Sequence, residues 1–271
     1  MTVCIAALCD NRKSLLLVAD RMIGLAIAEA ELNIRKTMPL HPDWWVMIAG
    51  NGIAPAFDII DAARGKLPQS DSVTVDAAMD AVADAYHAKR LSIAETRYIK
   101  SRGDTLAEFR ATGVNRYPKT LYREIDTKID DFELPLTLLV AGFDKNGVGQ
   151  IFIVTDPGEA HRQDIPAFAS IRSGKYTAEA SLLYRKMNPH MTLPKAVYFV
   201  FEAKVAGERA SGVGVDTDLY LVKKGQRAVR VAKKSENALD NIWVRLRPRE
   251  LSSNQTTTLR RLPEVRKVLG H

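Results

Sequence analysis

The sequence predicts an α+β fold in which helices cover a pair of antiparallel sheets. Segments with strand-like and helical patterns come in blocks, in the order strands, helices, strands, helices, strands. They do not alternate as parallel βαβ units would. The chain has 271 residues, of which 46% are hydrophobic and 26% charged, so it can bury a core without a disulfide or a metal.

The first block consists of four strands. Apolar segments on either side of the polar turn 10–13 predict a hairpin at the start of the chain. A second pair of strands is joined by residues 41–43, and Gly50 and Gly52 end its pattern. The four predicted strands are residues 2–8, 14–19, 32–39 and 44–49.

The helices form two groups with a second block of strands between them. Asp71 or Ser72 is expected to cap the second helix and Pro118 to start the fourth. Helical spacing of apolar residues predicts the first group over 53–63, 75–98, 105–112 and 119–132. The remaining elements are strands over 136–143, 150–156 and 167–171, helices over 176–186 and 193–206, and a strand over 218–223 that pairs with 228–232.

The net charge of +7 is confined to the end of the chain. Residues 226–271 contain 11 lysines and arginines against 4 aspartates and glutamates, whereas residues 1–225 contain 28 of each. We therefore predict one domain over 2–225 and a basic C-terminal extension over 226–271. In this extension, a solvated tail or an arm that interlocks subunits is favoured over binding to nucleic acid or an anionic surface. The tail is expected to hold a strand with Trp243, Arg245, Arg247 and Arg249 on one face, followed by a basic helix over 259–269.

The composition also excludes several classes of protein. Cys4 and Cys9 lie too close to the N-terminus to form a disulfide framework, which indicates a reducing compartment, and we expect the cytoplasm. No apolar run approaches the ~18 residues of a membrane helix and no signal peptide is visible, so no membrane partner is expected. Since the sequence has no phosphate-binding loop, zinc-type Cys/His spacing or Gly-x-Ser-x-Gly motif, we expect no cofactor or metal.

Short segments near the N-terminus form a pattern at fixed spacing. The chain begins MTVCIAAL, residues 18–21 read VADR, residues 33–36 read NIRK and residues 45–50 read WVMIAG. Asp20 and Lys36 are 16 residues apart, and Lys36 and Gly50 are 14 apart. The segments, their order and these two intervals resemble those of proteasome β-type subunits, of the peptidase HslV and of the bacterial proteasome homologue Anbu.

Two later segments extend the resemblance to about residue 222. ASIRSG, at residues 169–174, resembles the segment whose serine, here Ser173, precedes a helix in the family. ERASG, with Glu208 and Ser211, resembles the acid-x-x-Ser-Gly segment that supports the N-terminus, with glutamate in place of aspartate. The resemblance implies the four-layer αββα fold of N-terminal-nucleophile hydrolases. Residues 93–133 are then a helical insertion, and the basic extension has no counterpart in the family.

The resemblance also implies a chemistry. Removal of Met1 would give Thr2 a free α-amine, whose ordinary pKa of roughly 7.7–8.0 lets it act as the base for the Thr2 hydroxyl. Lys36 would disfavour the charged form of this amine, and Asp20 would hold Lys36 in place. The N–H of Gly50 would stabilise the oxyanion. The expected enzyme is a threonine peptidase that hydrolyses amide bonds in peptides or unfolded proteins.

Further roles follow from the same resemblance. Ser173, Glu208 and Ser211 would position the amine and a proton-relaying water. Ile48 and Gly52 would lie near the pocket for the residue before the scissile bond. The family forms homo-oligomers, which we expect here too, and an ATP-dependent unfoldase is a partner that the resemblance allows.

Several alternatives stay open. Counting back from Asp20 without a gap makes Cys4 the nucleophile, whereas a longer turn at 10–13 favours Thr2. Asp20 and Lys36 also fit a structural ion pair, and Ser173 fits a helix cap. Two other functions compete with the peptidase. One is an amidohydrolase that acts on a small molecule, and the other is a catalytically silent subunit that assembles and binds a partner through its basic tail.

Overall fold

The chain divides into two compact units, Met1–Val231 and Ala232–His271. The computed structural model describes residues 2–25, 28–31, 35–50, 53–68, 73–163, 165–247 and 259. The division falls a few residues after the boundary that the charge distribution predicts.

The first unit is a mixed α+β structure with two antiparallel five-stranded sheets, as predicted. The first sheet has the strand order β10-β1-β2-β11-β12, and the second has the order β5-β6-β7-β8-β9. The first is made of β10 (Phe168–Ile171), β1 (Cys4–Cys9), β2 (Ser14–Asp20), β11 (Thr217–Lys223) and β12 (Val229–Arg230). The second is made of β5 (Thr37–His41), β6 (Trp44–Gly50), β7 (Leu136–Phe143), β8 (Gly149–Thr155) and β9 (Glu159–Arg162). A separate hairpin joins β3 (Met22–Leu25) and β4 (Ala28–Glu31).

An apolar layer lies between the two sheets. Ala6 and Leu17 of the first sheet belong to the same buried cluster as Met47 and Leu139 of the second. Every residue of β1 and β2 is buried, which accounts for their continuous apolar runs. The two sheets therefore stack face to face and share one core.

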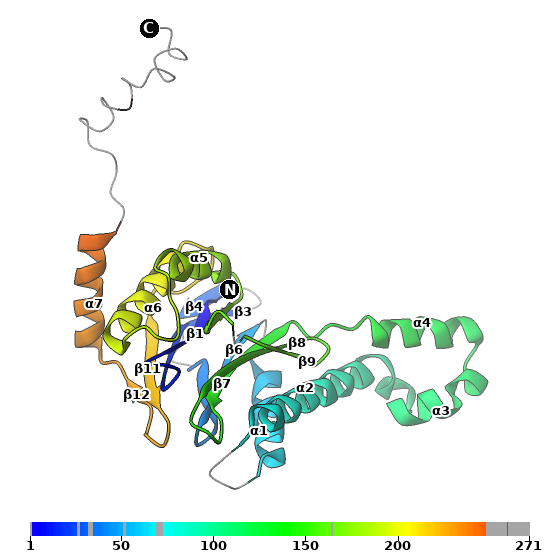
Figure 1. Ribbon diagram of the computed structural model, residues 1–271. Helices are drawn as coiled ribbons and strands as arrows, with labels where there is room; N and C mark the ends of the chain where they lie inside the picture. The colour runs from blue at the N-terminus through cyan, green and yellow to red at the C-terminus, as the bar shows by residue number, and fades with distance from the viewer. Residues whose placement is uncertain are drawn as a thin grey trace. The chain divides into compact units, whose positions relative to one another are not determined.

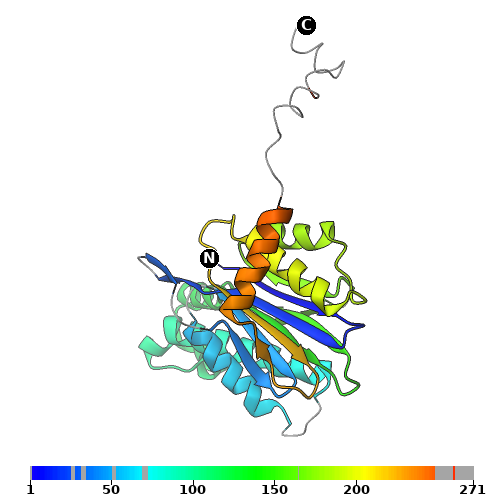
Figure 2. The same ribbon diagram turned by 90° about the vertical axis from the view of Figure 1, so that its left-hand side faces the viewer.

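Helices cover the other face of each sheet. On the second sheet, α1 (Ala54–Lys66) and α2 (Val75–Tyr98) pack over a cluster that includes Ile48, Ile59 and Val82. On the first sheet lie α5 (Lys175–Tyr184) and α6 (Leu193–Gly207), and α6 contacts both β1 and β2 (Figures 1 and 2).

The first hairpin has a four-residue turn. Cys9 pairs with Ser14, which leaves residues 10–13 outside the ladder. Asp10 has a φ of 49°, a conformation that Asp tolerates better than most residues. Its carboxylate accepts hydrogen bonds at 3.0 Å from the hydroxyl of Ser14 and from the N–H of Leu193. The predicted turn at 10–13 is confirmed, and the register that it sets places Thr2 and Val3 beside the end of β2.

The chain between α2 and β7 is largely helical, as predicted. It contains η1 (Lys100–Arg102), α3 (Leu106–Arg116) and α4 (Lys119–Asp130). Thr105 and Glu108 form a capping box at the start of α3. Phe109 of α3 stacks on Tyr122 of α4 with ring centroids 4.7 Å apart. Figure 1 shows α3 and α4 beyond the C-terminal half of α2.

Most predicted boundaries agree with the structure within a few residues, and those of α2 and β7 are identical. Three short strands, β3, β4 and β9, are not among the predicted ones. The cap of α2 is Thr74, whose side chain accepts a hydrogen bond from the N–H of Ala77 at 3.2 Å. The predicted caps, Asp71 and Ser72, lie outside the described residues. Pro118 occupies the cap position immediately before α4.

The predicted strand in the tail is wrong. Trp243 and Arg245 lie in α7 (Lys233–Leu246), and Arg247 caps its C-terminal end. Leu239, Trp243 and Leu246 recur at intervals of three or four, a helical period that outweighs the alternation of the arginines. Arg249 and the expected helix after Leu259 lie outside the described residues. None of the described helices is long and apolar enough to cross a membrane.

Candidate active site

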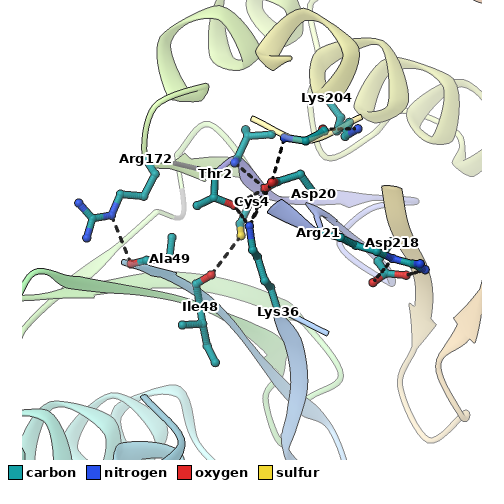
Figure 3. A network of polar contacts seen from close by, with 12 residues as sticks. Thr2, Cys4, Asp20, Arg21, Lys36, Ile48, Ala49, Arg172, Lys204 and Asp218 are labelled. Carbon is teal, nitrogen blue, oxygen red and sulfur yellow. Dashed lines mark hydrogen bonds and ion pairs between the residues drawn. The ribbon is translucent and has the colours of Figure 1, made fainter. Parts of the chain in front are cut away.

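Thr2, Asp20 and Lys36 meet in one buried cluster at the ends of three strands (Figure 3). Thr2 precedes β1, Asp20 ends β2 and Lys36 precedes β5. The Thr2 hydroxyl accepts a hydrogen bond from the Lys36 ammonium and donates one to Oδ1 of Asp20. The Lys36 Nζ lies 3.0 Å and 3.1 Å from the two oxygens of Asp20. Because the three residues are only 4%, 1% and 5% exposed, these contacts are shielded from water.

Backbone N–H groups hold Asp20 from two sides. Its Oδ1 accepts from the N–H of Val3 at 2.9 Å, and its Oδ2 accepts from the N–H of Gly214 at 3.1 Å. The Asp20 N–H in turn donates to the Val3 carbonyl at 3.2 Å. Burying a carboxylate is costly unless charges and hydrogen bonds compensate, and Asp20 has both. These contacts therefore fix the orientation of the Asp20 carboxylate toward Thr2 and Lys36.

Two glycines fix the N-terminal segment beside this cluster. The N–H of Gly174 donates to the Thr2 carbonyl at 3.5 Å. A Cβ on Gly174 would lie 2.8 Å from Cβ of Val3, and one on Gly207 would lie 3.3 Å from its Cγ2. Both glycines allow the ends of α5 and α6 to approach Val3. Sequence reasoning missed this role, although Gly174 directly follows the quoted Ser173.

Gly50 ends β6 and pairs with Leu136. A Cβ at this position would lie 2.6 Å from the Pro135 carbonyl oxygen, so only glycine fits without a backbone shift. Arg172, a residue that the sequence did not single out, bonds to the end of β6 and to the residue before β7. It donates from Nε to the Ala49 carbonyl at 3.3 Å, and from Nη2 to that of Pro135. Its positive φ of 70° is uncommon for a non-glycine residue.

Ile48 contributes only its backbone to the site. Its N–H donates to the carbonyl of Lys36 at 3.0 Å, and its carbonyl accepts from the Cys4 thiol at 3.6 Å. Its side chain is 2% exposed and lies in the core between the second sheet and the helices. Strand alternation explains this, because neighbouring Met47 and Ala49 face the other sheet. The Ile48 side chain therefore does not line a substrate pocket as predicted, and the other predicted pocket residue, Gly52, lies outside the described residues.

Cys4 is placed as a core residue. It pairs with Ala19 across the hairpin, whereas Thr2 reaches Asp20. Burial raises the pKa of the Cys4 thiol to about 12, although the positive charge of Lys36 lowers it. A thiol that stays protonated is a poor nucleophile. The geometry thus favours Thr2 over Cys4.

The other three candidates, Ser173, Ser211 and Glu208, differ in what they contact. Ser173 and Ser211 have no hydrogen bond to another described residue, and Ser211 is exposed. The helix-cap alternative for Ser173 is wrong, because α5 begins after Gly174 and has no side-chain cap. Glu208 pairs with the ammonium of Lys204. The structure therefore unites Thr2, Asp20 and Lys36 through side chains, whereas Ser173 and Ser211 make no hydrogen bond to another described residue.

A second ion cluster lies next to the site. Asp218 of β11 is 2% exposed and pairs with Arg21 and Arg230, each with a guanidinium nitrogen 2.7 Å from its Oδ1. Arg21 directly follows Asp20, so this cluster ties the end of β2 to β11 (Figure 3). In the part of the chain that the structure describes, no group of three or more histidine, cysteine or acidic side chains could hold a metal ion.

No protein-family model matches the chain, and no curated protein matches it significantly.

Proposed function

We propose that this protein is an N-terminal-nucleophile hydrolase that cleaves amide bonds with the hydroxyl of Thr2. One observation carries the proposal: a buried hydroxyl near the N-terminus contacts both a lysine ammonium and a carboxylate. The stacked sheets with helices on their other faces are compatible with the fold of that superfamily. Since the fold alone does not determine an activity, the proposal depends on the site.

The chemistry begins with the removal of Met1. The α-amine of Thr2 takes the hydroxyl proton while the oxygen attacks the amide carbonyl carbon. Lys36, whose ammonium contacts the same oxygen, stabilises the developing alkoxide. The N–H of Gly50 donates to the oxyanion. Collapse of the tetrahedral intermediate expels the amine, which receives the proton, and leaves an ester on Thr2 that water hydrolyses.

Asp20 positions the nucleophile in this scheme. Its carboxylate compensates the charge of Lys36 in a site where both side chains are almost completely buried. It also accepts a hydrogen bond from the Thr2 hydroxyl, which fixes the rotamer of that side chain. Asp20 thereby holds the Lys36 ammonium and the Thr2 hydroxyl in position.

The proposed substrate is a peptide or an unfolded protein, and the proposed assembly is a homo-oligomer in the cytoplasm. Both follow from the resemblance to proteasome-like peptidases. One observation favours a second candidate, the catalytically silent subunit. Ser173 and Ser211 make no hydrogen bond to another described residue.

Hydrolysis of fluorogenic peptide amides by protein from which Met1 has been removed tests the proposal. We expect activity in the wild type and in Thr2→Ser, and none in Thr2→Ala. Cys4→Ala is the matched control, because it changes the competing nucleophile and should keep the activity. Equal activity in Thr2→Ala and the wild type would contradict the proposal, and an inactive, fully processed wild type would favour the silent subunit.

A further inference from the structure

Lys204 is a completely buried lysine to which the proposed chemistry assigns no role. It lies on α6, and 0% of its side chain is exposed. Burying an ammonium is unfavourable unless paired charges and hydrogen bonds replace the lost water. The contacts of Lys204 therefore show what this burial accomplishes.

The Lys204 ammonium closes the loop 208–216 between α6 and β11. It pairs with the carboxylate of Glu208 at the start of the loop. It also donates to the carbonyl of Gly214 at 3.1 Å and to that of Val215 at 2.6 Å, near the end of the loop. The chain reverses between these contacts at Gly212, which has a φ of 73°. One side chain thus holds both ends of the loop.

The same loop reaches the candidate site at Gly214. The N–H of Gly214 donates to Oδ2 of Asp20 at 3.1 Å, while its carbonyl accepts from Lys204. On the opposite side, Oδ1 of Asp20 accepts from Val3, Thr2 and Lys36. Gly214 is thus the direct link between Lys204 and Asp20.

We propose that Lys204 is a positioning residue that holds the N–H of Gly214 on Asp20 and thereby orients the carboxylate that places Lys36 beside Thr2. The contacts of Lys204 described above are to Glu208, Gly214 and Val215, and none of them is a reacting atom. Its structural effect stands independently of the proposed function, whereas its kinetic effect rests on that function. The proposal also gives Glu208 a role, which is to neutralise Lys204.

Hydrogen exchange at the Gly214 amide tests the structural effect in full-length protein labelled with ¹⁵N-glycine. Losing the contacts to both carbonyls in Lys204→Met should speed this exchange by about 10-fold or more. Lys204→Arg, which keeps the charge and the donors, should restore much of the protection. Lys204→Gln, which lacks the charge, is a second variant for the case that Lys204→Met does not fold, and it should also exchange faster.

Arg185→Met is the matched control. Arg185, at the C-terminal end of α5, pairs with Glu202, which lies on α6 like Lys204, and its Nε is 3.0 Å from Oε2 of Glu202. Its loss therefore breaks a part-buried ion pair outside the loop 208–216. It should lower thermal stability and leave exchange at Gly214 unchanged. Equal acceleration in Arg185→Met and Lys204→Met, or wild-type exchange in both Lys204→Met and Lys204→Gln, would overturn the proposal.

A kinetic readout separates this proposal from the proposed function. Acylation of Thr2 by a β-lactone should slow by about 10-fold in Lys204→Met at saturating reagent, with an unchanged half-saturating concentration. A merely structural loss of folded protein would reduce the fraction that reacts and not the rate. If the wild type is not acylated at all, the proposed function fails, while exchange at Gly214 still decides the role of Lys204.

Discussion

The two sides of Thr2 differ in how firmly the structure supports them. On one side, Asp20 and Lys36 come from strand ends, are buried, and contact the Thr2 hydroxyl directly. On the other side, Ser173 and Ser211 lie in turns without a hydrogen bond to another described residue. Strand pairing fixes the positions of Asp20 and Lys36, because each lies at the end of a strand or directly before one. The positions of Ser173 and Ser211 depend on loops, which strand pairing does not fix.

This comparison predicts that the Asp20 side carries most of the function. Lys36→Met should lower acylation of Thr2 by about 10³-fold or more, the scale seen when a central catalytic group is removed from a serine protease. It should also lower the free energy of unfolding by about 3–5 kcal/mol, because it leaves Asp20 as a buried charge without its cation. Acylation kinetics and urea denaturation measure the two effects.

Lys66→Met is the control for the loss of a lysine ion pair. Lys66 pairs with Asp84 at 3.0 Å, but both side chains are about half exposed or more. Exposed pairs contribute about 0–1 kcal/mol, so stability and acylation should change little. A comparable loss in both variants would mean that the buried position of Lys36 has no special importance.

Gly50→Ala tests the backbone part of the same side. The added Cβ would lie 2.6 Å from the Pro135 carbonyl oxygen and would push the end of β6 away from β7. Displacing the proposed oxyanion donor should slow acylation by about 10²-fold. Gly65→Ala in α1 is the control, since nothing lies within 4 Å of its Cβ position, and it should stabilise the protein by about 0.5–1 kcal/mol. Equal acylation rates for the two variants would show that Gly50 is an ordinary strand residue.

Ser173→Ala and Ser211→Ala test the weakly supported side. Because neither hydroxyl bonds to another described residue, each change should alter the acylation rate by less than about 3-fold, the scale of a surface substitution. A much larger decrease in either variant would mean that these serines join the site once Met1 is removed. The comparison between the two sides would then apply only to the unprocessed chain.

The smallest expected effect concerns the thiols. Burial raises the pKa of both Cys4 and Cys9 to about 12, so iodoacetamide should modify neither in folded protein at pH 8 and both in urea. A pKa raised from 9.0 to about 12 adds stability that is complete below pH 9 and is lost as the pH rises toward 12. Rapid alkylation of folded protein at pH 8 would return Cys4 to consideration as the nucleophile.

The same contrast explains what the sequence could predict. The register of β1 and β2 follows from two apolar runs and the polar turn between them, so the sequence pattern predicts that Thr2 and Asp20 lie close together. The N–H of Gly214 acts through backbone, which carries no side-chain signal. Lys204 and Arg172 look like surface charges in the sequence, and only the structure shows one buried and the other bonded to two carbonyls. In α7, helical spacing prevailed over the alternating arginines.

The most direct test of Thr2 as the nucleophile is the intact mass of the purified protein before and after incubation with a β-lactone or a peptide epoxyketone. We expect a mass that lacks Met1 and a single covalent adduct that peptide mapping assigns to Thr2. Cys4→Ala should give the same adduct and Thr2→Ala none. A processed wild-type protein that forms no adduct, or forms it elsewhere, would contradict the role of Thr2 as the nucleophile.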